Sequence, residues 1–205
     1  MYPILWSSGS FALPAWHTFY VLGALAAYVL LLRLARLHAS QLSPPDLSRL
    51  YVVCYISGYL GARLLSILVE EPEVQGLGAT IRALTQFGSM TFYGGAIAIF
   101  VTGMAFAVAR GLSIPSLIDI ATPAGLLALA IGRIGCFLNG DDYGKAAPLF
   151  ESGQAPFWAV TFPNLQDGIA RYPVQLIESA GAALLVMVLC RHFVRIRLAL
   201  RPGAV

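Results

Sequence analysis

The chain has 205 residues, of which 58% are hydrophobic and only 11% are charged, and its formal net charge is +3. A soluble domain usually carries about 25% charged residues, and the apolar residues here fall into blocks near the ~20 residues that cross a bilayer. The composition therefore predicts an all-α, polytopic membrane protein with a single integral membrane domain over 1–205. It gives no sign of a basic, aromatic-rich surface for nucleic acid.

Five apolar segments predict five transmembrane helices, at about residues 16–37, 50–69, 90–110, 116–139 and 173–193. The first eleven residues lack the basic region of a cleavable signal peptide, so we expect the first helix to direct insertion. Ser43 and the two prolines after it predict an N-cap for the second helix. The loops 70–88 and 140–172 contain no apolar run long enough to span the membrane.

Basic residues predict the orientation of these helices. With five helices, eight arginines fall on one side of the membrane and three basic residues fall on the other. The first group is Arg33, Arg36, Arg49, Arg110, Arg191, Arg195, Arg197 and Arg201, and the second is Arg82, Lys145 and Arg171. The positive-inside rule then places the N-terminus outside, the C-terminus in the cytoplasm and both long loops outside.

The segment 132–144 (GRIGCFLNGDDYG) places several polar side chains at the outer end of the fourth helix. Arg133 is the first candidate for function, because an ionisable group inside an apolar segment is costly and needs a partner or a purpose. A guanidinium at the headgroup level is suited to contacting a phosphate. Alternatively, Arg133 pairs structurally with Glu178 or Asp119, or extends to the membrane interface.

Cys136 shares a helical face with Arg133, and we favour a packing role for it over a nucleophilic one. The three cysteines form no C-x-x-C pair, and neither a metal site nor a cofactor is predicted. Asn139 with the following glycine is a candidate helix C-cap. For Asp142 the simplest interpretation is a solvated turn, and this interpretation is weaker for Asp141.

Polar residues in three other helices are also candidates. Arg63 is either a second phosphate contact or the partner of Glu178. Glu178 lies three residues after Gln175 and could accept a proton or hold an arginine. Tyr93 precedes Gly94 and Gly95, which predict either close access to the backbone or tight helix packing.

Together these residues resemble a known family. The segment 132–144 resembles the signature of the prolipoprotein diacylglyceryl transferases, which are bacterial inner-membrane enzymes. The stretches 61–63 (GAR), 89–95 (SMTFYGG) and 171–178 (RYPVQLIE) resemble further motifs of that family in the same order. Asp119 and Pro123 also have counterparts, so the similarity covers nearly the whole chain.

The resemblance implies transfer of a diacylglyceryl group from phosphatidylglycerol to a lipobox cysteine thiol, with release of glycerol phosphate. Such a reaction needs a cation on the leaving phosphate and a group that takes the proton of the nucleophile. Arg133 falls on the family's essential arginine, which would hold the phosphate. Asn139, Asp141 and Gly144 fall on other signature positions.

The sequence also departs from the family pattern. Tyr93 and Tyr172 stand where the family has histidines, Cys136 stands for an asparagine, and Asp141 stands for a glutamate. A tyrosine, whose ordinary pKa is about 10, is a poorer base near neutral pH than a histidine. The sequence ends at Val205, soon after the fifth helix, so the family's later helices lie outside it.

We therefore expect an inner-membrane transferase that acts at the outer face on a phosphatidylglycerol-like phospholipid. Its acceptor is a lipoprotein cysteine or another nucleophile, such as a sugar or lipid hydroxyl. The expected catalytic residues are Arg133, Tyr93, Asp141 and Glu178, and the expected substrate-binding residues are Arg63, Asn139, Gly94, Gly95, Gly144, Gln175 and Cys136. The alternative is a non-catalytic lipid-binding subunit. A transporter fits less well, because the polar groups gather at one face.

Overall fold

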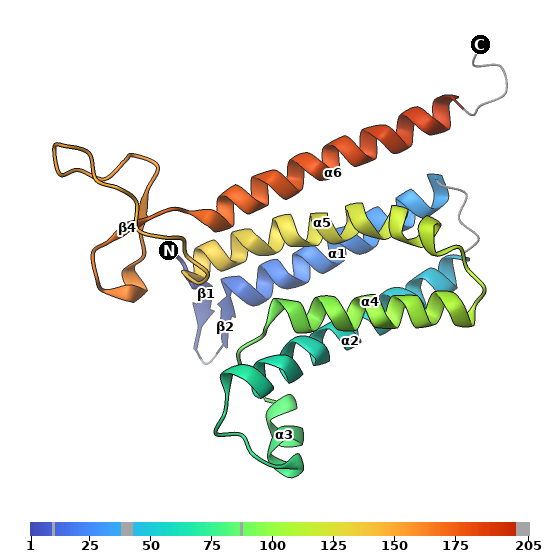
Figure 1. The fold of residues 1–205 in the computed structure, drawn as a ribbon, viewed down its shortest axis with the longest axis horizontal. Helices are drawn as coiled ribbons and strands as arrows, with labels where there is room; N and C mark the ends of the chain where they lie inside the picture. Colours follow the sequence, from blue (N-terminus) through green and yellow to red (C-terminus); the bar gives the residue numbers. More distant parts are fainter. Residues whose placement is uncertain (10, 38–42, 87, 200–205) are drawn as a thin grey trace. The chain divides into compact units, whose positions relative to one another are not determined.

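The computed structural model describes residues 1–9, 11–37, 43–86 and 88–199 (Figure 1). The described chain is mainly helical, and five of its helices are long and apolar enough to cross a membrane. These helices are α1 (Ala15–Leu37), α2 (Pro44–Glu70), α4 (Phe92–Ala109), α5 (Ile114–Asn139) and α6 (Val174–Ala199). The all-α membrane fold and the five predicted helices are thus confirmed. Arg201, which was counted for the orientation, lies outside the described residues.

The chain divides into two compact units, and α5 begins in one and continues in the other. The first unit contains Met1–His38 and Asp119–Val205, and the second contains Ala39–Ile118. The single membrane domain expected from the sequence stays a prediction.

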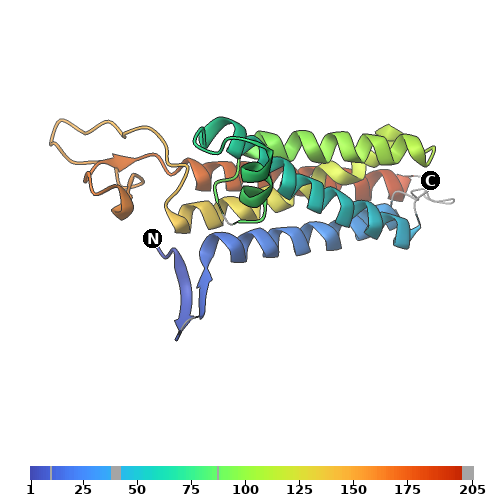
Figure 2. The same ribbon diagram turned by 90° about the horizontal axis from the view of Figure 1, so that it is seen from below.

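In the first unit, α1, α5 and α6 run side by side (Figures 1 and 2). Small residues allow this approach: a Cβ atom on Gly23 would lie 2.9 Å from the carbonyl oxygen of Ala128, and one on Gly135 would lie 2.7 Å from Cβ of Phe19. The hydroxyl of Ser179 on α6 donates to the carbonyl oxygen of Ala130 on α5 at 2.7 Å. Apolar surface alone gives little drive for association in lipid, so backbone proximity and interhelical hydrogen bonds hold the helices together.

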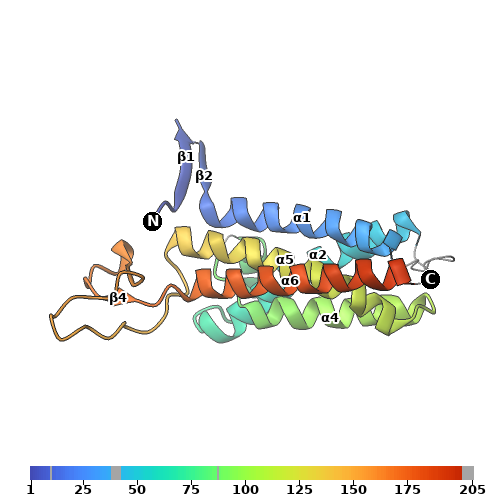
Figure 3. The same cartoon turned by 90° about the horizontal axis from the view of Figure 1, so that it is seen from above.

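Two short pieces of sheet in this unit were not predicted. An antiparallel hairpin of β1 (Ile4–Ser8) and β2 (Phe11–Pro14) leads directly into α1, and its direction crosses that of α1 (Figure 3). The amide of Tyr2 donates to the carbonyl oxygen of Leu138 at 3.0 Å, which ties the N-terminal segment to the end of α5. The loop between α5 and α6 contains the pair β3 (Val160–Thr161) and β4 (Ala170–Arg171) and the 3-10 turn η1 (Pro163–Leu165).

In the second unit, α2 and α4 pack closely through glycines. A Cβ atom on Gly61 would lie 2.6 Å from the carbonyl oxygen of Gly94, and one on Gly95 would lie 3.1 Å from the carbonyl oxygen of Gly58. Side chains larger than hydrogen at these positions would force the two helices apart. Small residues at such contacts are typical of helix packing in membranes.

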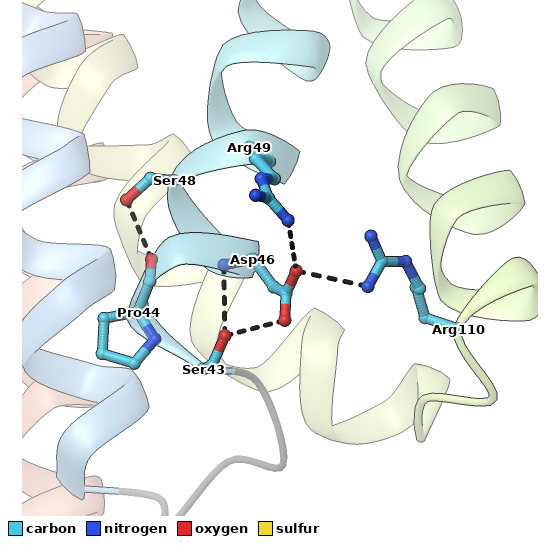
Figure 4. Close-up of polar contacts among 6 residues, drawn as sticks. All are labelled: Ser43, Pro44, Asp46, Ser48, Arg49 and Arg110. Carbon is cyan, nitrogen blue, oxygen red and sulfur yellow. Dashed lines mark hydrogen bonds and ion pairs between the residues drawn. The ribbon is translucent and has the colours of Figure 1, made fainter.

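Helix α2 begins at Pro44, six residues before the predicted start at residue 50, because a capping residue precedes it there. Ser43 is the N-cap, and its hydroxyl accepts the amide hydrogen of Asp46 at 3.3 Å (Figure 4). The carboxylate of Asp46 also forms two ion pairs, with Arg49 at 3.4 Å and with Arg110 at 3.2 Å (Figure 4). Arg110 follows the last residue of α4. The two arginines were predicted to lie on the same side of the membrane, and they share one carboxylate.

The loop 70–88 contains a helix that the sequence analysis missed, α3 (Leu77–Leu84). Eight residues are too few for a stable helix by propensity alone, so α3 depends on tertiary contacts. One such contact comes from Arg63, whose Nε donates to the carbonyl oxygen of Ala83 at 3.2 Å.

The contact between α2 and α4 gives a prediction for two glycine substitutions. Gly61→Ala should lower the melting temperature of the purified protein in detergent by roughly 3–10 °C, because the new methyl group overlaps α4. Gly103→Ala is the control on the opposite helix. A Cβ there would lie 3.9 Å from Sγ of Cys54, and alanine has the higher helix propensity, so the temperature should stay or rise. Equal melting temperatures for the two variants would contradict this account.

Candidate functional site

Arg133 on α5 lies at the centre of a polar cluster in the first unit. Its Nε and Nη2 contact one carboxylate oxygen of Glu178 on α6, and its Nη1 lies 2.6 Å from Oδ2 of Asp142. The arginine side chain is 19% exposed, while the two carboxylates are about half exposed. The pairing of Arg133 with Glu178, one of the alternatives considered from the sequence, is confirmed. Asp142, which was interpreted as a solvated turn residue, is in fact the second partner of the guanidinium.

The end of α5 directs Asp142 toward the arginine. Gly140 has a φ of +86°, and its amide donates to the carbonyl oxygen of Cys136 at 2.9 Å, so the helix ends in a left-handed turn after Asn139. Asp142 also has a positive φ, of 53°, a conformation that aspartate tolerates better than most residues. The chain thus reverses within three residues, which allows a carboxylate nine positions after Arg133 to reach it.

A second set of contacts fixes the loop after α5 to the start of α6. Gln175 is fully buried, and its Nε2 donates to the carbonyl oxygen of Asp141. The side chain of Asn139 donates to Asp141, and the amide of Gly144 donates to the carbonyl oxygen of Tyr172 at 3.1 Å. Glycine is required at 144, because a Cβ atom there would lie 2.7 Å from that same carbonyl oxygen. These predicted site residues therefore lie together around the end of α5.

Two further features complete this environment. Cys136 is half-buried and interacts with Arg133, as their common helical face predicted. Oε1 of Gln175 is a buried acceptor without a hydrogen-bond partner among the described residues. An acceptor in this state is unfavourable, so we expect a water molecule or another donor to reach it.

The loop 140–172 is anchored on the cluster at several points. Phe162 is fully buried and lies edge-on to Phe137 of α5, and the side-chain amide of Asn164 donates to the carbonyl oxygen of Gly140 at 3.0 Å. Farther out, Asp167 accepts the amide hydrogen of Ile169 and pairs with Arg171 at 2.7 Å. The Ile169 amide and then the arginine hold the pKa of the Asp167 carboxyl below its usual value. The loop is therefore a folded segment of the site rather than a simple connection.

Arg63 lies in the second unit and is enclosed by protein. Its side chain is only 3% exposed, and it pairs with both carboxylate oxygens of Glu71. It also donates to the carbonyl oxygen of Ser89 at 3.1 Å. A Cβ atom on Gly88 would lie 2.5 Å from Cζ of Arg63, so the backbone passes directly over the guanidinium. The alternative that Arg63 pairs with Glu178 is wrong, because its partner comes from the end of its own helix.

The other candidates of the second unit lie at the start of α4. Gly94 and Gly95 are buried and pack against α2, as one of the two interpretations from the sequence predicted. The side chain of Tyr93 is 71% exposed, next to the ring of Phe92. The hydroxyl of Thr91 donates to Glu70 at 2.9 Å, which fixes the start of α4 to the end of α2.

The structure thus groups seven of the predicted site residues in the first unit and four in the second. The first group is Arg133, Cys136, Asn139, Asp141, Gly144, Gln175 and Glu178, to which the structure adds Asp142. The second group is Arg63, Tyr93, Gly94 and Gly95. In the described part of the chain, no group of three or more histidine, cysteine or acidic side chains could hold a metal ion.

Comparison with known proteins places the chain in a family context. A family model described as prolipoprotein diacylglyceryl transferase matches residues 3–205. A phosphatidylglycerol–prolipoprotein diacylglyceryl transferase of Geobacter sulfurreducens is 29% identical to it, over 86% of this chain and 65% of the relative. Proteins with the same name from Bradyrhizobium diazoefficiens and Erythrobacter litoralis are 33% and 28% identical. They are matched over 73% and 98% of this chain and over 49% and 72% of the relatives.

The chain therefore spans about two thirds or less of the length of several of these relatives, with 65% of the Geobacter protein and 49% of the Bradyrhizobium protein matched.

The enclosure of Arg63 gives a stability prediction. Arg63→Leu should destabilise the protein by at least about 2 kcal/mol, because it leaves the partly buried carboxylate of Glu71 without its cation. The measurement is the melting temperature in detergent. Arg49→Leu is the control on the same helix, since Arg49 is 68% exposed and pairs with Asp46 at only 3.4 Å. A loss for Arg63→Leu no larger than for Arg49→Leu would contradict the structural role.

Proposed function

Because the chain belongs to the prolipoprotein diacylglyceryl transferase family, we propose that it moves a glyceryl- or diacylglyceryl-type group from a phosphatidylglycerol-like phospholipid to an acceptor nucleophile. The names of its relatives specify phosphatidylglycerol and a prolipoprotein. A lipoprotein cysteine thiol is accordingly the first acceptor to test, with a sugar or lipid hydroxyl as the alternative.

The chain is a multi-pass membrane protein of bacterial type, and its described residues contain five helices long enough to span a membrane. The positive-inside rule supports an orientation in which the C-terminus is cytoplasmic and the Arg133 cluster faces outward. We place the protein in the inner membrane, with its site at the periplasmic face.

The position of Arg133 is the observation that carries this proposal. In the reaction, the nucleophile forms a bond to the glyceryl carbon while the bond from that carbon to a phosphate oxygen breaks. The electron pair of that bond leaves with the phosphate, so negative charge develops there and a guanidinium stabilises it. Arg133 lies at the end of an apolar helix in the family signature, and its charge is held in place by carboxylates of two different segments.

The carboxylates beside Arg133 supply the second chemical requirement, a group that takes the proton from the nucleophile. We assign this role to Glu178 or Asp141, since both lie in the cluster and a carboxylate can accept a proton directly or through one water molecule. The role of Tyr93, which stands where the family has a histidine, as a catalytic hydrogen-bond donor stays a prediction from the sequence.

The remaining site residues would bind and orient the lipid. We propose that Asn139, Gly144, Gln175 and Cys136 shape the headgroup site around Arg133. Gly94 and Gly95 would keep the start of α4 close to α2. A direct phosphate contact from Arg63 stays a prediction, and it requires that phosphate replace Glu71 on the enclosed guanidinium.

A non-catalytic lipid-binding subunit is the second candidate. It is favoured by one observation: the guanidinium of Arg133 already has carboxylate partners, so the cluster is stable without a substrate. Bound phospholipid without turnover, together with unchanged function in Tyr93→Phe and Asp141→Ala, would support this candidate over the enzyme.

Replacement of Arg133 tests the enzymatic proposal. In membranes that contain the wild-type protein, labelled phosphatidylglycerol should be consumed and a lipidated cysteine peptide should form. Arg133→Ala should lower the rate by about 100-fold or more, because the charge on the leaving phosphate loses its cation. Arg82→Gln, which removes an exposed arginine from α3, should leave the rate unchanged. Absence of phospholipid turnover in the wild type would overturn the enzymatic proposal.

A further inference from the structure

We propose that Asp142 is an internal competitor for the anion site on Arg133, and that it is displaced when the phosphate of a lipid headgroup binds. This inference rests on the proposed function, because it concerns how the same site takes up its lipid. In this role Asp142 sets the affinity of the site for phospholipid. From the sequence alone, Asp142 was interpreted as a residue of a solvated turn.

The guanidinium of Arg133 is already occupied by carboxylates. Nε and Nη2 of Arg133 contact Glu178, and Nη1 contacts Asp142 at 2.6 Å. Every nitrogen of the side chain therefore has a carboxylate partner. A phosphate that binds the guanidinium at Nη1 therefore competes with the carboxylate of Asp142 for that nitrogen.

Of the two carboxylates on Arg133, that of Asp142 is the easier one to displace. Glu178 contacts two nitrogens and extends from α6, where helical hydrogen bonds restrain the backbone. Asp142 meets one nitrogen and extends from a turn, where its side chain is 57% exposed. Its carboxylate can return to water at low cost, whereas the contact of Glu178 is more constrained. Asp142 is accordingly the partner that leaves.

Replacement of the Asp142 carboxylate by a lipid phosphate does not change the charge paired with Arg133. A phosphodiester and an ionised aspartate each carry a single negative charge, so the guanidinium is equally neutralised before and after the exchange. The displaced carboxylate stays near the bound phosphate, together with Asp141 and Glu178, and repels it. Asp142 thus weakens phosphate binding twice, by competition and by repulsion, and removal of its charge should strengthen binding.

The test measures lipid binding directly. The purified 205-residue chain in detergent is titrated by calorimetry with dioctanoyl-phosphatidylglycerol, dioctanoyl-phosphatidylcholine and inorganic phosphate. Asp142→Asn, which keeps the shape of the side chain and tolerates a positive φ, should bind the phosphatidylglycerol about three- to tenfold more tightly than the wild type. Asp142→Gly is a second variant that accepts the same backbone conformation, and it should show the same gain if the asparagine variant folds poorly.

Asp167→Asn is the matched control, because Asp167 is another acidic residue of the same loop that pairs with an arginine, at 2.7 Å. Its substitution makes the same change in net charge, and its affinity for phosphatidylglycerol should stay within about twofold of the wild-type value. An equal gain for Asp167→Asn and Asp142→Asn would show a general charge effect and overturn the inference.

The remaining outcomes separate this inference from the proposed function. If the wild type binds phosphatidylglycerol, Arg133→Ala loses binding and both Asp142 variants bind no better than the wild type, then the inference fails and the proposed function stands. If no variant binds phosphatidylglycerol, or if Arg133→Ala binds it as the wild type does, then both fail. Tighter binding of inorganic phosphate alone by the Asp142 variants, without a gain for the lipid, also contradicts a headgroup site.

Discussion

An arginine inside an apolar helix is stable only where its charge is compensated, and this requirement organises the region around the end of α5 in the first unit. Arg133 on α5 forms ion pairs with Glu178 of α6 and with Asp142 of the loop that follows α5. The same region is held by Gln175, which contacts the backbone of Asp141. The helix end, the turn and the start of α6 are therefore fixed by one set of polar contacts in an otherwise apolar environment, where each unsatisfied polar group is costly.

In the second unit, the charge of the membrane arginine Arg63 is compensated in a different way. Arg63 is enclosed by protein, and its guanidinium donates four hydrogen bonds, two to the carboxylate of Glu71 and two to the backbone carbonyl groups of Ala83 and Ser89. These contacts hold α3 and the segment before α4 against α2. The two membrane arginines thus differ in a functionally important respect. Arg63 is covered by the backbone at Gly88, while Arg133 has half-exposed partners that solvent or a ligand can reach.

The contrast explains why a charged cluster can serve both stability and binding. An exposed ion pair contributes little to stability, because water solvates its members nearly as well as they solvate each other. For the same reason its members exchange partners at low cost. A site that must take up an anionic headgroup at the membrane surface needs this property, and the pair of Arg133 with Asp142 has it, whereas the pair of Arg63 with Glu71 does not.

The sequence by itself predicted the five membrane helices of the described residues, because hydrophobic length is a local property of the chain. Most of their ends lie within two residues of the predicted bounds, but α2 begins earlier, at Pro44, and α6 continues to Ala199. It also identified Ser43 as a cap and Arg133 as the residue that needed a partner. Family motifs pointed to most of the residues around the end of α5.

Only the tertiary structure decided which carboxylate meets which arginine. Several acidic residues were available to Arg63 and Arg133, and their spacing along the sequence does not rank them, since the partner depends on how separate segments fold back. The short helix α3 was missed because eight residues give only a weak helical signal, and its contact with Arg63 comes from a separate segment of the chain. Asp142 was missed because a left-handed turn after Gly140, rather than a helical face, carries its side chain to the arginine.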